Sequence, residues 1–154
     1  MSNRPGLRVL VIRCGDSACA LPLVGLNEVM RPLALEPSPR APPFVLGMSM
    51  IRGTLVPVVD LALLVTGAPT ARIGRYLTVS VGTRAVALAV SEVLGVHELA
   101  RPSFSSLPPL LGSEKSPLVQ AIATLDSQLL RVLREARAVG QELFALIESQ
   151  ELSA

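Results

Sequence analysis

The sequence predicts an all-β protein of small barrels with one amphipathic helix at the C-terminal end. Short apolar segments, rich in β-branched residues, recur along most of the 154-residue chain. Turn signals made of Gly, Asp, Ser and Pro separate these segments. The hydrophobic period changes to that of a helix only near the end of the chain. Short strands in this arrangement favour small barrels over alternating strands and helices, and the length fits one domain with its own core.

The first part of the chain is predicted to hold three extended segments followed by a stiff connector. The expected strands cover residues 7–14, 18–23 and 26–30, with a turn over residues 15–17. Residues 32–43 contain five prolines. Proline lacks the N–H that helices and central strands require, so we expect an irregular connector there.

Residues 44–61 contain the most informative pattern of the chain. Two apolar runs flank Arg52 and Gly53, which predicts two strands joined by a tight turn in which Gly53 supplies a positive φ. A single arginine is thereby placed at a strand end among apolar residues. No nucleophile, base or set of metal ligands lies near it in the sequence. An isolated guanidinium beside apolar surface suits docking, so the pattern indicates a binding module.

The second part of the chain repeats the strand pattern. A short helix is expected over residues 60–65, closed by Gly67 and Pro69, and a long surface loop over residues 100–117, which are rich in Ser and Pro. The remaining expected strands are residues 75–81, 84–90, 92–99, 119–125 and 128–132.

The tail of the chain has the period of an amphipathic helix that packs on the barrels. One face collects six apolar residues, while Gly140 is expected to weaken the middle of the helix. The apolar face consists of Leu133, Ala136, Val139, Leu143, Phe144 and Ile147.

Several function classes are disfavoured by composition. A net charge of +2 and four scattered aromatic residues offer neither a basic surface nor a stacking platform for nucleic acid. His97 is the single histidine and has no Cys or carboxylate cluster at ligand spacing, so we expect no metal site. The chain has no Gly-rich phosphate loop and no nucleophile elbow. We therefore expect no enzyme and no cofactor.

Residue patterns also bear on cellular location and on the two cysteines. The apolar runs are shorter than the ~20 residues of a membrane span, and the N-terminal region does not resemble a signal peptide. We expect a cytoplasmic protein without direct membrane contact. Cys14 and Cys19 flank a turn and are interpreted as small core residues, with a regulatory disulfide as the alternative.

Four motifs follow one another in a fixed order. They are an apolar strand leading through Gly15-Asp16 to Leu26-Asn27-Glu28-Val29, then Pro42-Pro43-Phe44-Val45-Leu46-Gly47, then residues 50–61 around Arg52-Gly53, and finally residues 123–133. In this order and content the chain resembles the CheW family, the coupling proteins of bacterial chemosensory arrays, over residues 7–147.

This resemblance implies two intertwined five-stranded SH3-like barrels with a groove between them. The domain would cover residues 7–147, with flexible termini at residues 1–6 and 148–154. The implied function is that of a non-enzymatic adaptor, recruited to chemoreceptor arrays. It would couple the cytoplasmic tip of methyl-accepting chemoreceptors to the regulatory domain of a CheA-type histidine kinase.

The resemblance also carries site residues over to this chain. The implied receptor-binding residues are Arg52, Leu26, Glu28 and Val96. The implied kinase-binding residues are Leu35 and Gly47, which we expect on the first barrel beside a flat, uncharged strand edge over residues 46–51.

Two departures from the family pattern keep other functions open. Met50 stands where the signature has Asn, and Ser91 stands where the family often has Asp. One alternative is therefore an accessory CheW-like protein that binds receptors but not the kinase. Another is a small-ligand sensor that uses the groove as a pocket, for which the sequence offers little polar lining.

Overall fold

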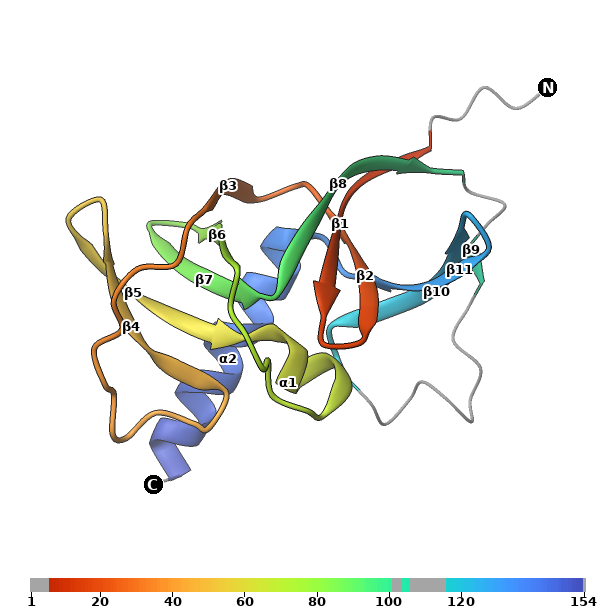
Figure 1. Ribbon diagram of the computed structural model, residues 1–154. Coiled ribbons are helices and arrows are strands. Elements are labelled where there is room, and N and C mark those ends of the chain that lie inside the picture. Colours follow the sequence, from red (N-terminus) through yellow and green to blue (C-terminus); the bar gives the residue numbers. More distant parts are fainter. Residues whose placement is uncertain (1–5, 101–103, 106–115, 154) are drawn as a thin grey trace.

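Two β-sheets and two helices form the part of the protein that the structure describes (Figure 1). The computed structural model describes residues 6–100, 104–105 and 116–153. The first sheet has the order β8-β1-β2-β11-β10-β9, and the second has the order β3-β6-β7-β5-β4. The first sheet consists of β1 (Leu7–Cys14), β2 (Ser17–Pro22), β8 (Glu92–Leu99), β9 (Phe104–Ser105), β10 (Val119–Leu125) and β11 (Gln128–Leu133). The second sheet consists of β3 (Leu26–Met30), β4 (Val45–Ile51), β5 (Thr54–Asp60), β6 (Arg75–Val81) and β7 (Arg84–Val90).

The predicted fold class is confirmed. Each sheet contains one parallel pair that joins distant segments, β2 with β11 and β5 with β7, so the two barrels share the chain in an intertwined way. The first sheet has five long strands, to which the two-residue β9 adds on β10. Residues 104–105 are therefore a strand within the expected surface loop. The rest of that loop, residues 101–103 and 106–115, and residues 1–5 lie outside the described residues.

Helix α1 (Leu61–Thr66) lies between the two sheets. Its buried residues Leu61, Ala62 and Val65 share one hydrophobic cluster with residues of β1 and β7. The helix begins after Asp60, whose carboxylate accepts a hydrogen bond from the Leu63 N–H, as an N-cap does. The backbone N–H of Thr70 donates to the same carboxylate at 2.9 Å. The buried Asp60 carboxylate thus accepts both hydrogen bonds and holds the end of β5 in place.

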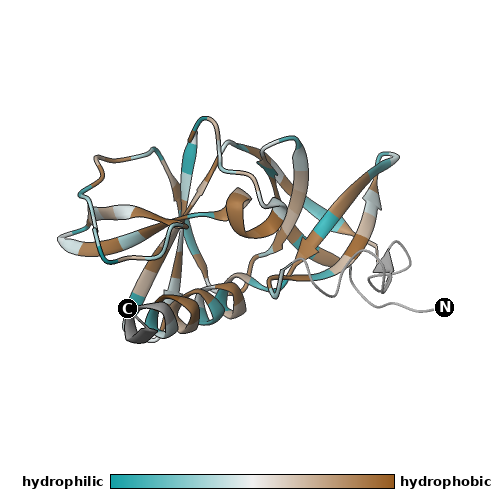
Figure 2. Cartoon of the chain, turned by 90° about the horizontal axis from the view of Figure 1, so that it is seen from below, coloured by the Kyte–Doolittle hydropathy of each residue, from teal (hydrophilic) through white to brown (hydrophobic). Residues whose placement is uncertain are grey.

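Helix α2 (Ala136–Ser153) packs against the second sheet and extends past Ile147, where we expected the domain to end (Figure 2). Gly140 has a packing role in addition to its low helix propensity. A Cβ at this position would lie 2.6 Å from Val81 Cγ2 and 3.0 Å from Val79 Cγ1. The missing side chain therefore lets the helix approach β6 closely, at the expense of helix propensity.

Cys14 and Cys19 are both free and fully buried, as expected of core residues. A hydrogen bond with Cys19 and burial both raise the pKa of the Cys14 thiol. A protonated, buried thiol is a poor nucleophile. The pair therefore contributes to packing between β1 and β2.

Candidate docking surfaces

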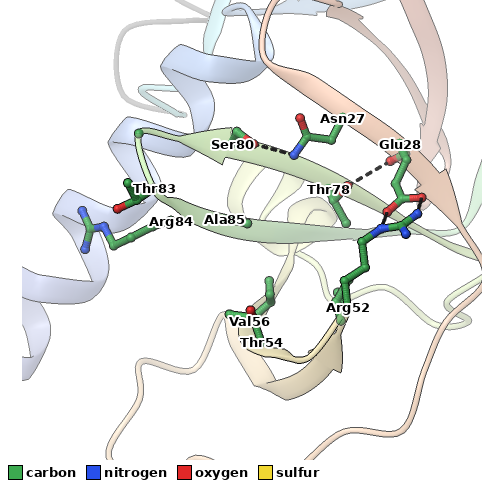
Figure 3. A pocket seen from close by; sticks show the side chains of 12 residues that line it. Asn27, Glu28, Arg52, Thr54, Val56, Thr78, Ser80, Thr83, Arg84 and Ala85 are labelled. Carbon is green, nitrogen blue, oxygen red and sulfur yellow. Dashed lines mark hydrogen bonds and ion pairs between the residues drawn. The ribbon is translucent and has the colours of Figure 1, made fainter.

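The β4–β5 turn brings the two edges of the second sheet together. β3 and β4 are the edge strands of this sheet. The turn has positive φ at both central residues, 50° at Arg52 and 79° at Gly53. The positive φ expected at Gly53 is confirmed, and Arg52 adopts one as well. Two positive φ angles are typical of the tight hairpin turn whose twist matches its strands. The turn projects the Arg52 side chain towards β3 (Figure 3).

Arg52 is paired, in contrast to the isolated guanidinium expected from the sequence. Its Nε donates to Glu28 Oε1 at 2.9 Å and its Nη2 donates to Glu28 Oε2 at 2.8 Å. This bidentate contact holds the pKa of Glu28 below its usual range, chiefly through the hydrogen bond from Arg52. The Arg52 side chain remains 77% exposed and that of Glu28 31% exposed. The pair thus closes the open side of the second barrel with two side chains that solvent and partners can reach.

A groove of about 420 Å³ lies beside this ion pair (Figure 3). Its apolar lining comes from Ile51, Val56 and Ala85, and Arg84 stands at the end near α2. Hydroxyl and amide groups supply the rest of the lining, in contrast to the few polar residues expected. These polar residues are Asn27, Thr54, Thr78, Ser80 and Thr83. The groove is therefore a mixed surface with charged groups at both ends, the Arg52–Glu28 pair at one and Arg84 at the other.

The four implied receptor-binding residues do not all gather in the groove. Glu28 and Arg52 meet directly, although 24 positions separate them in the chain. Leu26 begins β3 but packs, half-buried, against the main core. Val96 lies on β8 in the first sheet, where its side chain is 51% exposed and Leu94 is 38% exposed. Val96 is accessible but does not line this groove.

Several groove residues were not predicted from the sequence. Thr78 and Ser80 are polar residues at alternate positions of an otherwise apolar strand, so β-strand alternation could have placed them on one face. Asn27 donates to the Ser80 hydroxyl and so links β3 to β6 within the lining. No sequence pattern marked Arg84 as a groove residue. Its guanidinium lies 4.0 Å from the centre of the Phe144 ring and pairs with Glu148 at 2.8 Å.

The two implied kinase-binding residues lie close together, but on the second sheet. Leu35 belongs to residues 33–36, which we call the strap because they run along β4. The Glu36 N–H donates to the Met48 carbonyl at 2.7 Å, and the Met48 N–H donates to the Glu36 carbonyl at 2.8 Å. The two residues were expected on the first barrel, and the structure corrects this placement. Both β4 and the strap belong to the sheet that carries Arg52.

The edge of β4 is not an open, flat edge. The strap covers it at Met48, and Gly47 is buried beneath with a φ of 151°. A Cβ on Gly47 would lie 2.5 Å from the Glu36 carbonyl oxygen and 3.5 Å from Leu35 Cβ. Gly47 therefore makes room for the strap, while Leu33 and Leu35 remain 40% and 38% exposed.

The described residues offer neither a metal site nor a membrane-spanning helix. In the described part of the chain, no three His, Cys, Asp or Glu residues come together in a way that could hold a metal ion. Among the described residues, no helix combines the length and the apolar character needed to cross a membrane. The groove and the strap are thus surfaces made of ion pairs, hydroxyls and aliphatic side chains.

Two small intertwined barrels that present an ion-paired groove and an apolar strap define a docking module of the adaptor class. Sequence comparison gives the family: the CheW-like domain model matches residues 8–142. The chain belongs to this family of chemotaxis scaffold proteins, which generally have no enzymatic activity.

Individual proteins are similar to the chain to different degrees. Protein FrzA of Myxococcus xanthus is 32% identical over 114 residues, which cover 72% of this chain and 69% of that protein. A chemotaxis protein CheW of Helicobacter pylori is 22% identical, over 86% of this chain and 81% of that protein. The crystal structure of the scaffolding protein TtCheW from Thermoanaerobacter tengcongensis superposes with a TM-score of 0.71 at 21% identity, and covers 83% of this chain and 88% of that chain. The likeness to that structure supports the fold.

Proposed function

We propose that this protein is a cytoplasmic adaptor that couples chemoreceptors to a CheA-type histidine kinase in chemosensory arrays. Membership of the CheW-like family supports the proposal at the level of chemotaxis scaffolding. The observation that carries it is the exposed Arg52–Glu28 pair beside a groove with apolar lining. An adaptor needs surfaces that bind partners without chemistry, and holding two partners together raises the effective concentration of one at the other.

The receptor contact is assigned to the groove and the Arg52 end. Two of the five N–H groups of Arg52 bond Glu28, so three remain for a partner. Glu28 fixes the direction in which those donors point, which lowers the entropy lost on binding. The end of a receptor helical hairpin would then place apolar side chains on Ile51 and Val56 and a polar group on Arg52.

The kinase contact is assigned to the strap. Leu33 and Leu35 are exposed aliphatic side chains on a segment that hydrogen bonds hold against β4. An interface core is typically depleted of charge. The strap meets this condition at residues 33–35, which carry no charge. It also lies on the same sheet as the receptor groove, so a conformational change of the bound receptor can bias the conformation of the bound kinase through β4 and β5.

One observation favours the receptor-only alternative. The strap covers the β4 edge at Met48, and Met50 is 56% exposed where the family signature has Asn. A kinase that required an open β4 edge would find it occupied. An accessory protein that binds receptors alone would be unaffected, because neither Met48 nor the strap lines the groove.

Separate titrations with a receptor tip fragment and with the kinase regulatory domain distinguish the two functions. The coupling function predicts that the protein binds both, and that Arg52→Ala weakens receptor binding at least about fivefold while leaving kinase binding unchanged. Arg75→Ala is a matched control, because Arg75 is an exposed arginine on the same sheet that does not line the groove. Binding to the receptor without measurable kinase affinity would establish the receptor-only function, and unchanged receptor affinity of Arg52→Ala would remove the groove from the site.

A further inference from the structure

Two buried hydroxyl groups hold the strap from below. Tyr76 is 1% exposed and Ser49 is fully buried. The Tyr76 hydroxyl donates to the Leu33 carbonyl at 3.0 Å, and the Ser49 hydroxyl donates to the Ala34 carbonyl at 2.9 Å. Both acceptors are backbone carbonyls of the strap, immediately before Leu35.

These two bonds act at the half of the strap that backbone pairing does not reach. The two backbone bonds between the strap and β4 involve Glu36, at its far end. Pro32 and Pro37 border the strap and have no N–H to donate. Without the hydroxyls, the segment carrying Leu33 and Leu35 would be tethered to β4 only through Glu36.

The two hydroxyls are separate tethers. A hydroxyl has one hydrogen to donate. If Ser49 gives its hydrogen to Ala34 and Tyr76 gives its hydrogen to Leu33, none is left for the 3.4 Å contact between the two oxygens. Removal of one hydroxyl should therefore leave the other tether intact, and removal of both should free this half of the strap.

From this geometry we infer that Tyr76 and Ser49 are positioning residues: their hydroxyls hold the strap so that Leu33 and Leu35 are presented to the kinase. The inference rests on the proposed kinase contact. Neither hydroxyl touches the partner, because both residues are buried. They act by keeping a non-helical, proline-bordered segment in its binding conformation, so that binding does not have to order it.

The test uses the full chain and the regulatory domain of the cognate kinase. Tyr76→Phe and Ser49→Ala should each lower kinase affinity about 2- to 10-fold, the range expected for loss of one neutral hydrogen bond. Because the two oxygens lie 3.4 Å apart and hold the same segment, the double variant should lower it by more than the product of the two factors. Receptor affinity should stay within about twofold of the wild type, because neither residue lines the groove.

Further readouts separate positioning from a loss of stability. Amide exchange should accelerate at Glu36 in the double variant but not at Leu77, in the centre of β6. In a Leu35→Ala background, removal of the hydroxyls should have a smaller effect on kinase affinity, because the presented side chain is already absent. Thr66→Val is the matched control, since it removes a hydroxyl that donates to the Ala62 carbonyl within α1, away from the strap.

Each outcome has a distinct meaning. If the wild type binds the kinase and the double variant binds equally well, the positioning role is overturned. If the double variant and Thr66→Val lose equal affinity, the effect is one of general stability and the role is likewise overturned. If the wild type itself has no kinase affinity, the kinase contact is wrong, and the presentation role falls with it.

Discussion

The two edges of the second sheet are closed in opposite ways. At β3 the closure is an exposed ion pair, Arg52 with Glu28, made by two side chains. At β4 the closure is the strap, held by two backbone bonds and two buried hydroxyls. An exposed pair exchanges its partner with little loss of folding energy, since such pairs contribute little to stability. The strap is exposed but is held by the buried hydroxyls of Ser49 and Tyr76, so its opening would break the hydrogen bonds of two buried groups. The β3 edge is therefore suited to exchange with a partner, and the β4 edge to rigid presentation.

The largest effect on stability is expected from a substitution in the core, away from both edges of the second sheet. Phe144 is 8% exposed and belongs to the main core beneath the second sheet. Phe144→Ala should lower the free energy of unfolding by about 3–5 kcal/mol, measured by chemical denaturation. Leu129→Ala is the control: Leu129 is 71% exposed, so the change should stay within about 0.5 kcal/mol. Both docking surfaces should weaken together in Phe144→Ala. Loss of one partner at wild-type stability would make α2 an interface.

Gly47→Asp should break the β4 edge itself. The new side chain would meet the Glu36 carbonyl in a backbone conformation that side chains rarely adopt. Such strain alone amounts to about 1–3 kcal/mol, and we expect a total loss of about 3 kcal/mol or more in unfolding free energy. The variant is thus a poor probe of kinase binding, because it disturbs the fold at this edge.

Leu35→Asp tests the same edge without that clash. The side chain of Leu35 is 38% exposed and can be replaced with the strap in place. An unpaired charge buried at the interface should lower kinase affinity at least about 30-fold and leave the melting temperature nearly unchanged. Equal kinase binding by this variant and the wild type would exclude the strap from the interface.

Glu28→Gln tests the exchangeable edge. The substitution keeps the size of the side chain but removes the charge that orients Arg52. Receptor affinity should fall about 2- to 10-fold, less than for Arg52→Ala, because Arg52 itself remains. Kinase affinity should not change. A receptor affinity lower than that of Arg52→Ala would mean that Glu28 touches the receptor directly.

The smallest effect concerns pH and salt. Because pairing with Arg52 lowers the pKa of Glu28, the pair stabilises the folded state at neutral pH, and this contribution is lost as pH falls through that lowered value. The small difference in melting temperature between wild type and Glu28→Gln should therefore be present at pH 7 and shrink as the pH falls below about 4.3, the usual pKa of Glu. It should also shrink in ~1 M salt. A difference that persists in acid would show that the pair is not its cause.

Much of the fold could be predicted because its signals are local. Apolar alternation and turn residues placed the long strands to within one or two residues, for example at residues 75–81 and 84–90. The ion pair could not be foreseen by local reasoning. Glu28 and Arg52 meet only because β3 pairs with β6 while β5 pairs in parallel with β7, and both pairings join segments far apart in sequence.

The strap shows a second limit of sequence reasoning. The prolines of residues 32–43 correctly predicted a connector without helix, but composition does not show that Tyr76 and Ser49 supply the bonds that fix the strap. Gly140 shows a third limit. Propensity correctly marks it as a weak helix former, whereas its close approach to Val81 depends on tertiary packing alone.

The intertwined strand order has a consequence for the order in which the protein can assemble during synthesis. All strands of the second sheet come from one continuous stretch, residues 26–90, whereas the first sheet combines β1 and β2 with strands that begin at residue 92 or later. Because chains emerge N-terminus first, β2 must wait for β11 with one edge unpaired, and an unpaired edge invites association with other chains. A nascent chain can therefore build its docking sheet before its first barrel closes. We expect fragments that end before residue 119 to aggregate through the unpaired edge of β2.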